Sequence, residues 1–155
     1  MNMVEFLETL REPVRLMTGL PDGAVSIYAQ QDLAEQVAHA CSVHQCAVLI
    51  GLTGARGLPD RQVGNNTITA VLEVEVWTPQ VILTMGGVQC LTICESIMAG
   101  LHGYATGGRL VTAGSARVPA FTTWTLREER SREGSEYLVG NMQFTVPLVP
   151  VLLVE

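Results

Sequence analysis

The sequence predicts an α+β protein: a mostly antiparallel β-sheet with two main helices packed on one of its faces. Two observations carry this prediction. Near residues 4–17 and again near 86–103, apolar residues recur at steps of three and four, which is the spacing of a helix with one buried side. In the segments between and after them, apolar and polar residues alternate, as in an antiparallel strand with one face in the core. This order of elements fits one helical layer on one sheet.

The N-terminal helix is expected to bury the side formed by Val4, Leu7, Leu10, Val14 and Met17. Pro13 lacks a backbone N–H, so we expect a kink or a restart of the helix there. The turn sequence "GLPDG" ends this helix, and residues 24–28 predict a short strand. Asp32 would then cap a brief helix containing Leu33, Ala34, Val37 and Ala38.

The apolar run "CAVLIGLTG" (46–54) predicts the next strand, and the polar stretch "GLTGARGLPDRQVGNN" (51–66) predicts an overlong loop after it. A hairpin connection needs only about two to five residues. We therefore expect this loop to be a functional arm that contacts a partner. Its candidate partner-binding residues are Arg56, Asp60, Arg61 and Asn65.

The clearest strand is the alternating stretch "TITAVLEVEVWT" (67–78). Its core face is predicted to consist of Ile68, Ala70, Leu72, Val74 and Val76, and its solvent face to include Thr69, Glu73 and Glu75. The two glutamates have no acid partner in the sequence pattern, so we interpret them as a solvated sheet face and not as a catalytic pair. Val71 and Trp77 interrupt the polar face, which makes them candidates for an oligomer interface.

The second main helix is expected to bury a stripe formed by Val88, Leu91, Cys94, Met98 and Leu101, widened by Ile93 and Ile97, and to stop at Gly103. Two strands, 116–126 and 135–149, follow and are joined by the charged stretch "REERSREG". Arg127, Arg130 and Arg132 lie there among Glu128, Glu129 and Glu133. This mixture indicates a solvated hairpin tip and not a phosphate clamp.

The C-terminal segment divides from the rest of the chain at Pro147. We expect one domain over 1–146 and an extended apolar arm over 147–155, because Pro147 and Pro150 lack the N–H that a central strand needs. Burying the apolar side chains of this arm is worth on the order of 5–10 kcal/mol before ordering costs. We therefore expect it to lie on a sheet edge or to dock onto a neighbouring copy through Val149, Val151, Leu152 and Leu153. Packing of the arm on its own domain is the alternative.

The composition restricts the classes of function. The chain has 155 residues, 48% of them hydrophobic and 15% charged, and a net charge of −6 with no lysine. Proteins usually bind the phosphate backbone of DNA through clustered basic side chains. This acidic chain is poor in such side chains, so sequence-specific DNA binding, which also depends on backbone contacts, is not expected. The high apolar content indicates that another chain covers part of the surface. No apolar stretch is long enough to span a bilayer and the N-terminus lacks a signal-peptide pattern, so we expect a cytoplasmic protein without membrane contact.

The stretch "HACSVHQC" (39–46) raises the possibility of a metal site. Zinc needs four converging nitrogen or sulfur ligands, whereas Cys41, His44 and Cys46 supply only one cluster without a second half. Reduced cysteine commonly packs as a small apolar residue, so no metal or other cofactor is expected. No serine, cysteine or carboxylate pattern predicts a nucleophile with a base, and we do not expect an enzyme.

The layout resembles a phage protein family. The residues that carry the resemblance are the strand "ITAVLEVEVWT" (68–78), the helix end "IMAGLHGY" (97–104) and the last strand "YLVGNMQFTV" (137–146). In this order the chain is similar to the small Mu-type phage tail proteins related to tail terminators, the completion proteins of long-tailed phages. The resemblance covers nearly the whole chain. The stretch "QQDLAEQVAHACSVHQ" (30–45) and the apolar arm depart from the family pattern.

The resemblance implies a structural virion protein of a long-tailed phage or prophage. Such a protein forms a homo-oligomeric, often hexameric ring that caps the tail tube, stops its polymerisation and docks to the head–tail connector. Its partners would be other copies of itself, the tube or sheath protein and the connector. It would be found in the host cytoplasm during assembly and in the virion tail. An acidic chain suits a lumen through which DNA passes without adhering.

Two alternatives stay open at this point. The first is another tail-tube or head–tail neck component, which would polymerise into open stacks where a terminator closes and stops. The second is a small metal-binding domain that uses Cys41, His44 and Cys46 as ligands.

Overall fold

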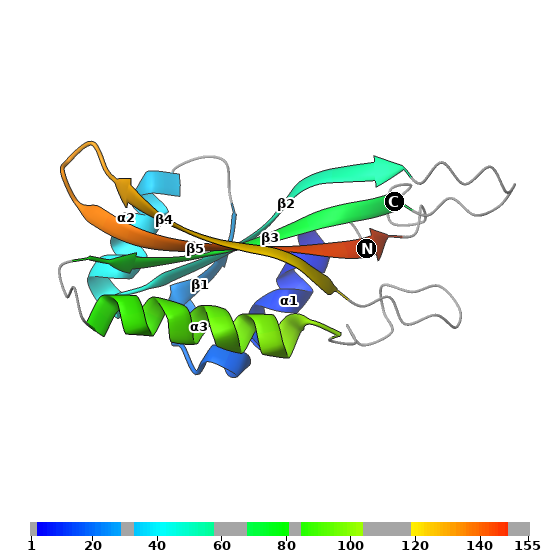
Figure 1. The fold of residues 1–155 in the computed structure, drawn as a ribbon, viewed down its shortest axis with the longest axis horizontal. Helices are drawn as coiled ribbons and strands as arrows, with labels where there is room; N and C mark the ends of the chain where they lie inside the picture. Colours follow the sequence, from blue (N-terminus) through cyan, green and yellow to red (C-terminus); the bar gives the residue numbers. More distant parts are fainter. Residues whose placement is uncertain (1–2, 29–32, 58–67, 81–84, 104–118, 149–155) are drawn as a thin grey trace, which may run out of the picture.

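The computed structural model of the chain describes residues 3–28, 33–57, 68–80, 85–103 and 119–148 (Figure 1). Its elements are α1 (Met3–Thr18), a 3-10 turn (Asp22–Ala24), β1 (Val25–Ile27), α2 (Leu33–His44), β2 (Ala47–Gly57), β3 (Ile68–Pro79), α3 (Met85–Leu101), β4 (Ala120–Arg130) and β5 (Glu136–Leu148). The fold is α+β with a mostly antiparallel sheet, as predicted. Among the helices that the structure describes, none is both long and apolar enough to cross a membrane.

The five strands form one sheet in the order β1-β2-β3-β5-β4. β1 runs parallel to β2, and the three other pairings are antiparallel. The alternation predicted for residues 67–78 is confirmed, because Ala70, Leu72, Val74 and Val76 of β3 are all buried. These residues face the main core together with Met142, Phe144 and Val146 of β5.

The helices divide between the two faces of the sheet (Figure 1). α1 and α3 contribute to the main core on one face, as predicted for the two main helices. α2 packs on the other face, where a smaller cluster joins it to the ends of β2 and β5. The members of that smaller cluster are Val37, Ala40, Cys41, Ala47, Leu49, Tyr137 and Val139.

Both main helices are rotated slightly from their predicted orientation. In α1, Phe6 is buried and Val4 is 61% exposed, and the helix passes Pro13 without an interruption. In α3, Cys90 is buried and Leu91 is 46% exposed. A narrow apolar stripe is compatible with two helix orientations that differ by a small rotation about the helix axis. In α3, the packing against β5 determines which of the two orientations is adopted.

The strands are longer than the sequence indicates at two places. The strand predicted over 46–54 continues to Gly57, so residues 55–57, predicted as loop, belong to β2 and pair with β3, and Arg56 lies opposite Thr69. β4 continues to Arg130, so only Arg132 of the three arginines assigned to the hairpin tip lies in the turn. Local turn chemistry does not show how far a strand is extended by pairing with its neighbour.

The last strand also passes the predicted boundary at residue 146. β5 ends at Leu148, and Pro147 lies opposite Thr69 of β3. β4 begins only at Ala120, which pairs with Thr145, so Pro147 has no described neighbour on its second side and its missing N–H costs no ladder bond.

Several strands begin or end at the same end of the sheet. Gly57, Ile68 and Leu148 are aligned by the strand register, and the N–H of Gly103 donates to the carbonyl of Pro119 at 2.8 Å. Gly103 has a φ of 73°, a conformation that suits glycine and ends α3 as predicted. β2, β5 and α3 therefore end, and β3 begins, at the same end of the described fold (Figure 1).

Candidate functional site

The two edges of the sheet differ in how far their backbone is protected. β1 is only three residues long, and two of its carbonyls accept hydrogen bonds from side chains. Nε of Arg11 in α1 donates to the carbonyl of Val25 at 2.9 Å, and Nε2 of Gln36 in α2 donates to that of Ile27 at 3.5 Å. A short edge covered by side chains cannot accept another strand.

The opposite edge is open. β4 has eleven residues, and no described strand lies beyond it. Thr123, Trp124, Thr125 and Leu126 are all exposed, uncharged and regularly paired with β5 on their other side. We name Thr123–Leu126 the open edge segment. A strand edge of this composition is a template for pairing with another chain.

Protected residues flank the open edge segment on both sides. Before it, the N–H of Phe121 donates to Nδ1 of His102 at 3.0 Å, and a register shift separates Phe121 from Thr123. After it come the charged residues 127–130. Bulges and charges both discourage pairing, so the edge is open only along its uncharged middle.

β2 beyond Gly51 also has one side without a described partner, because β1 pairs only with residues 48–50. Glycines at 54 and 57, a register shift between Leu52 and Gly54, and the charged Arg56 interrupt this stretch. Glycine and bulges weaken strand pairing. The open edge segment of β4 is therefore the better candidate for docking.

The open edge segment carries two large apolar side chains. Trp124 is 37% exposed and Leu126 is 42% exposed. They lie opposite Met142 and Gly140 of β5, and opposed residues in a sheet point to the same face. Both therefore face the layer of α3, while Thr123 and Thr125 face the other side.

On that other side, a charged group occupies the middle of the sheet. Glu75 of β3 is buried and accepts a hydrogen bond from Arg127 of β4 at 2.7 Å. Arg127 also pairs with Glu129 at 2.8 Å and lies over the ring of Trp77 at 5.7 Å. Burial disfavours the charge of Arg127, but its hydrogen bonds with the two glutamates outweigh this effect and raise its pKa. The prediction that Glu75 is solvated is wrong, because Arg127 covers it.

The predicted interface residues on β3 lie on this same face. Trp77 is half-buried within its own chain and packs edge-to-face on Tyr137 with 5.6 Å between ring centroids. Val71 is half-buried and lies between Gly54 of β2 and Thr145 of β5. Contact of either residue with a second copy stays a prediction. Asp60, Arg61 and Asn65 of the loop and Val149, Val151, Leu152 and Leu153 of the arm lie outside the described residues.

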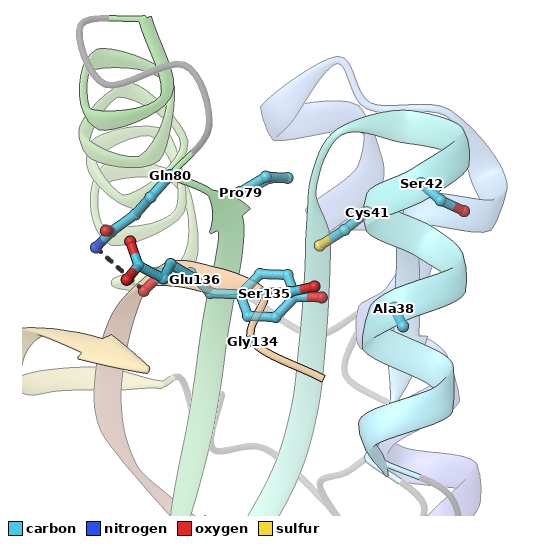
Figure 2. A pocket seen from close by; sticks show the side chains of 9 residues that line it. Ala38, Cys41, Ser42, Pro79, Gln80, Gly134, Ser135 and Glu136 are labelled. Carbon is cyan, nitrogen blue, oxygen red and sulfur yellow. Dashed lines mark hydrogen bonds between the residues drawn. The ribbon is translucent and has the colours of Figure 1, made fainter. Parts of the chain in front are cut away.

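A surface hollow of about 530 Å³ lies between α2, the end of β3 and the β4–β5 turn (Figure 2). Four of its polar side chains have partners within the chain. The thiol of Cys41 donates to the carbonyl of Trp77, the Ser42 hydroxyl to that of His39, and the Gln80 amide to that of Tyr137. Glu136 is paired with Arg130. Cys41, Ser42, Gln80 and Glu136 are therefore engaged in local contacts and do not form a set of groups directed at a ligand.

The four cysteines are buried thiols. Burial raises the pKa of Cys41 to about 12 and that of Cys46 to about 11. A hydrogen bond with Cys90 and burial both raise the pKa of Cys94. A protonated thiol is a poor nucleophile and a poor metal ligand.

Cys41 and Cys46 also belong to different clusters, on opposite faces of the sheet. Within the described part of the chain, no three His, Cys, Asp or Glu side chains are arranged to hold a metal ion. The ligand set of the metal-binding alternative is therefore not brought together.

We expect all four thiols of the native protein to resist Ellman's reagent at pH 8, because all four are buried. Cys41, Cys46 and Cys94 also have raised pKa values, whereas the hydrogen bond with Cys94 lowers the pKa of Cys90, so that the resistance of Cys90 depends on burial alone. Four equivalents should react after unfolding in guanidinium. The absorbance of the released thiolate measures both numbers. Reaction of one equivalent within minutes in the native state would contradict the burial of these cysteines.

The sequence alone did not identify the residues that make the edges unequal. Trp124 and Leu126 were placed in a strand, but nothing local marks that strand as an edge. Arg11 and Gln36 gave no signal, because their partners are backbone atoms 14 and nine residues away. The uncharged run "TTWTL" before four charged residues was the available clue.

Comparison of the sequence with protein-family models found no match, and comparison with curated proteins found none either.

Proposed function

We propose that this protein is a structural tail-completion protein of a long-tailed phage or prophage, which forms a closed ring of identical copies, caps the tail tube and docks to the head–tail connector. The observation that carries the proposal is the inequality of the two sheet edges. One edge is short and covered by Arg11 and Gln36, while along the other no strand among the described residues pairs with the outer side of Thr123–Leu126. An edge of this kind favours association through one particular side of the molecule.

The inequality restricts how copies can associate. Because β1 is short and covered, β4 of one copy meets either the β4 edge of another copy, which gives a two-fold dimer, or a different surface. A contact between two different surfaces repeats from copy to copy, and it gives a closed ring where the rotation closes. This property agrees with the ring that the family resemblance implies.

The face of the sheet that carries α2 supports the same proposal. Where α2 does not cover this face, its polar and acidic side chains are exposed or half-buried. Among them is Glu73, whose carboxylate accepts a hydrogen bond from Gln143 at 3.5 Å. A hollow of about 390 Å³ between Tyr28 and Glu73 lies beside this surface. A wall of this charge does not attract the phosphates of DNA, as the lumen of a tail requires.

The test is the assembly state of the purified chain at high and low concentration. Light scattering should give a multiple of the monomer mass, and negative-stain micrographs should show closed rings of uniform size. Open stacks that lengthen with concentration would favour a tube component instead. A monomer at every concentration up to the millimolar range would contradict the proposal, whereas a monomer only on dilution would not, because association obeys mass action.

A matched pair of variants connects the assembly to the open edge segment. Thr125→Lys places a charge on an exposed edge residue, and self-association should weaken by about tenfold or more. Leu16→Lys places the same charge on α1, at a residue that is 67% exposed and far from β4 in sequence, and assembly should not change. Equal assembly in both variants would show that the ring, if one forms, does not use β4.

A further inference from the structure

We infer that the open edge segment of β4 binds the C-terminal apolar arm of another copy, as an added strand. The inference rests on the self-association in the proposed function, and it names the segment that occupies the edge. The arm has the sequence "VPVLLVE" (149–155), which is uncharged up to Val154. Strand addition of this kind obtains affinity from backbone hydrogen bonds and specificity from alternate side chains.

The length and chemistry of the two segments match. Thr123–Leu126 and the residues beside it offer an uncharged edge between the protected Phe121 and the charged Arg127. Trp124 and Leu126 give that edge apolar surface on the side of α3. Val151, Leu152, Leu153 and Val154 supply apolar side chains in both alternate positions of a strand. Pro150 is tolerated there, because the arm would become the new edge and needs donors on only one side.

The arm cannot reach this position on its own chain. β5 ends at Leu148, whereas Thr123 and Leu126 lie opposite Gln143 and Gly140, five and eight residues earlier in β5. A strand outside β4 would also lie two strand spacings from β5, about 10 Å to the side. Residues 149–154 would have to span about 28 Å to bring Val154 beside Leu126, but six residues extend over at most about 22 Å.

Even the nearest point of the segment is out of useful range. Thr123 is about 20 Å from Leu148 by the same geometry, so residues 149–154 would be fully extended across β4 on reaching it and could not also pair along the open edge segment. A second copy has no such restriction, since its arm can approach β4 from outside. The occupant is therefore the arm of another copy. Exchange that passes from copy to copy in one direction builds the proposed ring, whereas reciprocal exchange between two copies would stop at a dimer.

Cysteine cross-linking between differently labelled copies tests the exchange. One population carries Thr125→Cys and the other carries Val151→Cys, Leu152→Cys or Leu153→Cys, so that both alternate positions of the arm are sampled. Neighbouring residues on paired strands lie about 4.5–5.5 Å apart, within the range of a disulfide. The native cysteines are buried and should not take part.

The expected result is a disulfide between the two populations after they are mixed and oxidised. A chain that carries both substitutions should give a ladder of covalent oligomers on a non-reducing gel. Each population oxidised alone, without its partner, is the control and should stay monomeric on the same gel.

Four outcomes would overturn the inference. Thr125→Cys forming disulfides with itself would show that two β4 edges pair directly. A monomer with an internal disulfide in the doubly substituted chain would show that the arm binds its own edge. Closed rings in micrographs without any Thr125-to-arm disulfide would remove the arm exchange and leave the proposed function standing, whereas absence of any oligomer would contradict both.

Discussion

Replacing Gly140 with alanine is expected to destabilise the protein by about 3 kcal/mol, because there is no room for a methyl group at this position. A Cβ added to Gly140 would lie 2.3 Å from the sulfur of Cys94 and 3.6 Å from that of Cys90. Both thiols belong to α3, which packs directly on β5 at this point. The added atom would force α3 away from the sheet, and a loss of this size lowers the melting temperature by about 6–12 °C.

A double variant shows whether the clash with Cys94 is the cause. Cys94→Ala removes the sulfur that the new methyl group would meet, so Gly140→Ala combined with Cys94→Ala should be more stable than Gly140→Ala alone. The coupling between the two sites is expected to reach about 1–3 kcal/mol. Guanidinium denaturation of the four proteins measures it.

Gly54→Ala is the matched control for this experiment, because a Cβ at Gly54 meets nothing within 4 Å. Its stability should stay within about 1 kcal/mol of the parent chain. An equal loss in both glycine variants would contradict the argument from packing, since it would show that the strands lose stability for reasons unrelated to α3.

The packing at Gly140 also positions the open edge segment. The indole Nε1 of Trp124 lies 3.7 Å from the place that a Cβ on Gly140 would take, and Leu126 is the residue directly opposite Gly140. Cys94 of α3 and Trp124 of β4 therefore both approach Gly140 of β5, and the missing side chain of this glycine leaves the room for them. Because the position of Trp124 depends on this contact, Gly140→Ala should weaken self-association as well as folding.

The sequence predicted the parts of the fold that depend on local pattern. The alternation in residues 67–78 identifies the core face of β3, and the three- and four-residue steps identify α1 and α3, because burial on one side imposes these periods on the chain. The same reasoning could not fix the rotation of α3. Cys90 and not Leu91 is buried because small thiols fit against Gly140, and this is a property of the partner strand.

The candidate site could not be predicted in the same way, because it depends on strand order. Whether "TTWTL" is an edge or a centre is decided by which strands flank it, and β5 inserts between β3 and β4 although it comes last in the chain. The protection of β1 depends on Arg11 and Gln36 meeting particular carbonyl groups. The burial of Glu75 likewise depends on an arginine 52 residues away.

Replacing Arg127 with alanine is expected to cost about 2–3 kcal/mol, because it leaves the carboxylate of Glu75 buried without its partner. The side chain of Glu75 is 8% exposed and that of Arg127 is 39% exposed. A fully buried pair would lose about 3–5 kcal/mol, but water can enter where the partly exposed guanidinium stood and reduces the loss. The variant also loses the contact between Arg127 and Trp77, which adds to the expected effect.

Charge removal at Glu75 separates these contributions. Glu75→Gln keeps the shape of the side chain, so Arg127→Ala combined with Glu75→Gln should recover about 1–2 kcal/mol of the loss. Arg130→Ala is the control from the same strand, because Arg130 and its partner Glu136 are 70% and 48% exposed and such a pair contributes less than about 1 kcal/mol. If Arg130→Ala and Arg127→Ala unfold at the same denaturant concentration, Arg127 is one more solvated charge of the hairpin, and the sheet face around Glu75 is accessible to water.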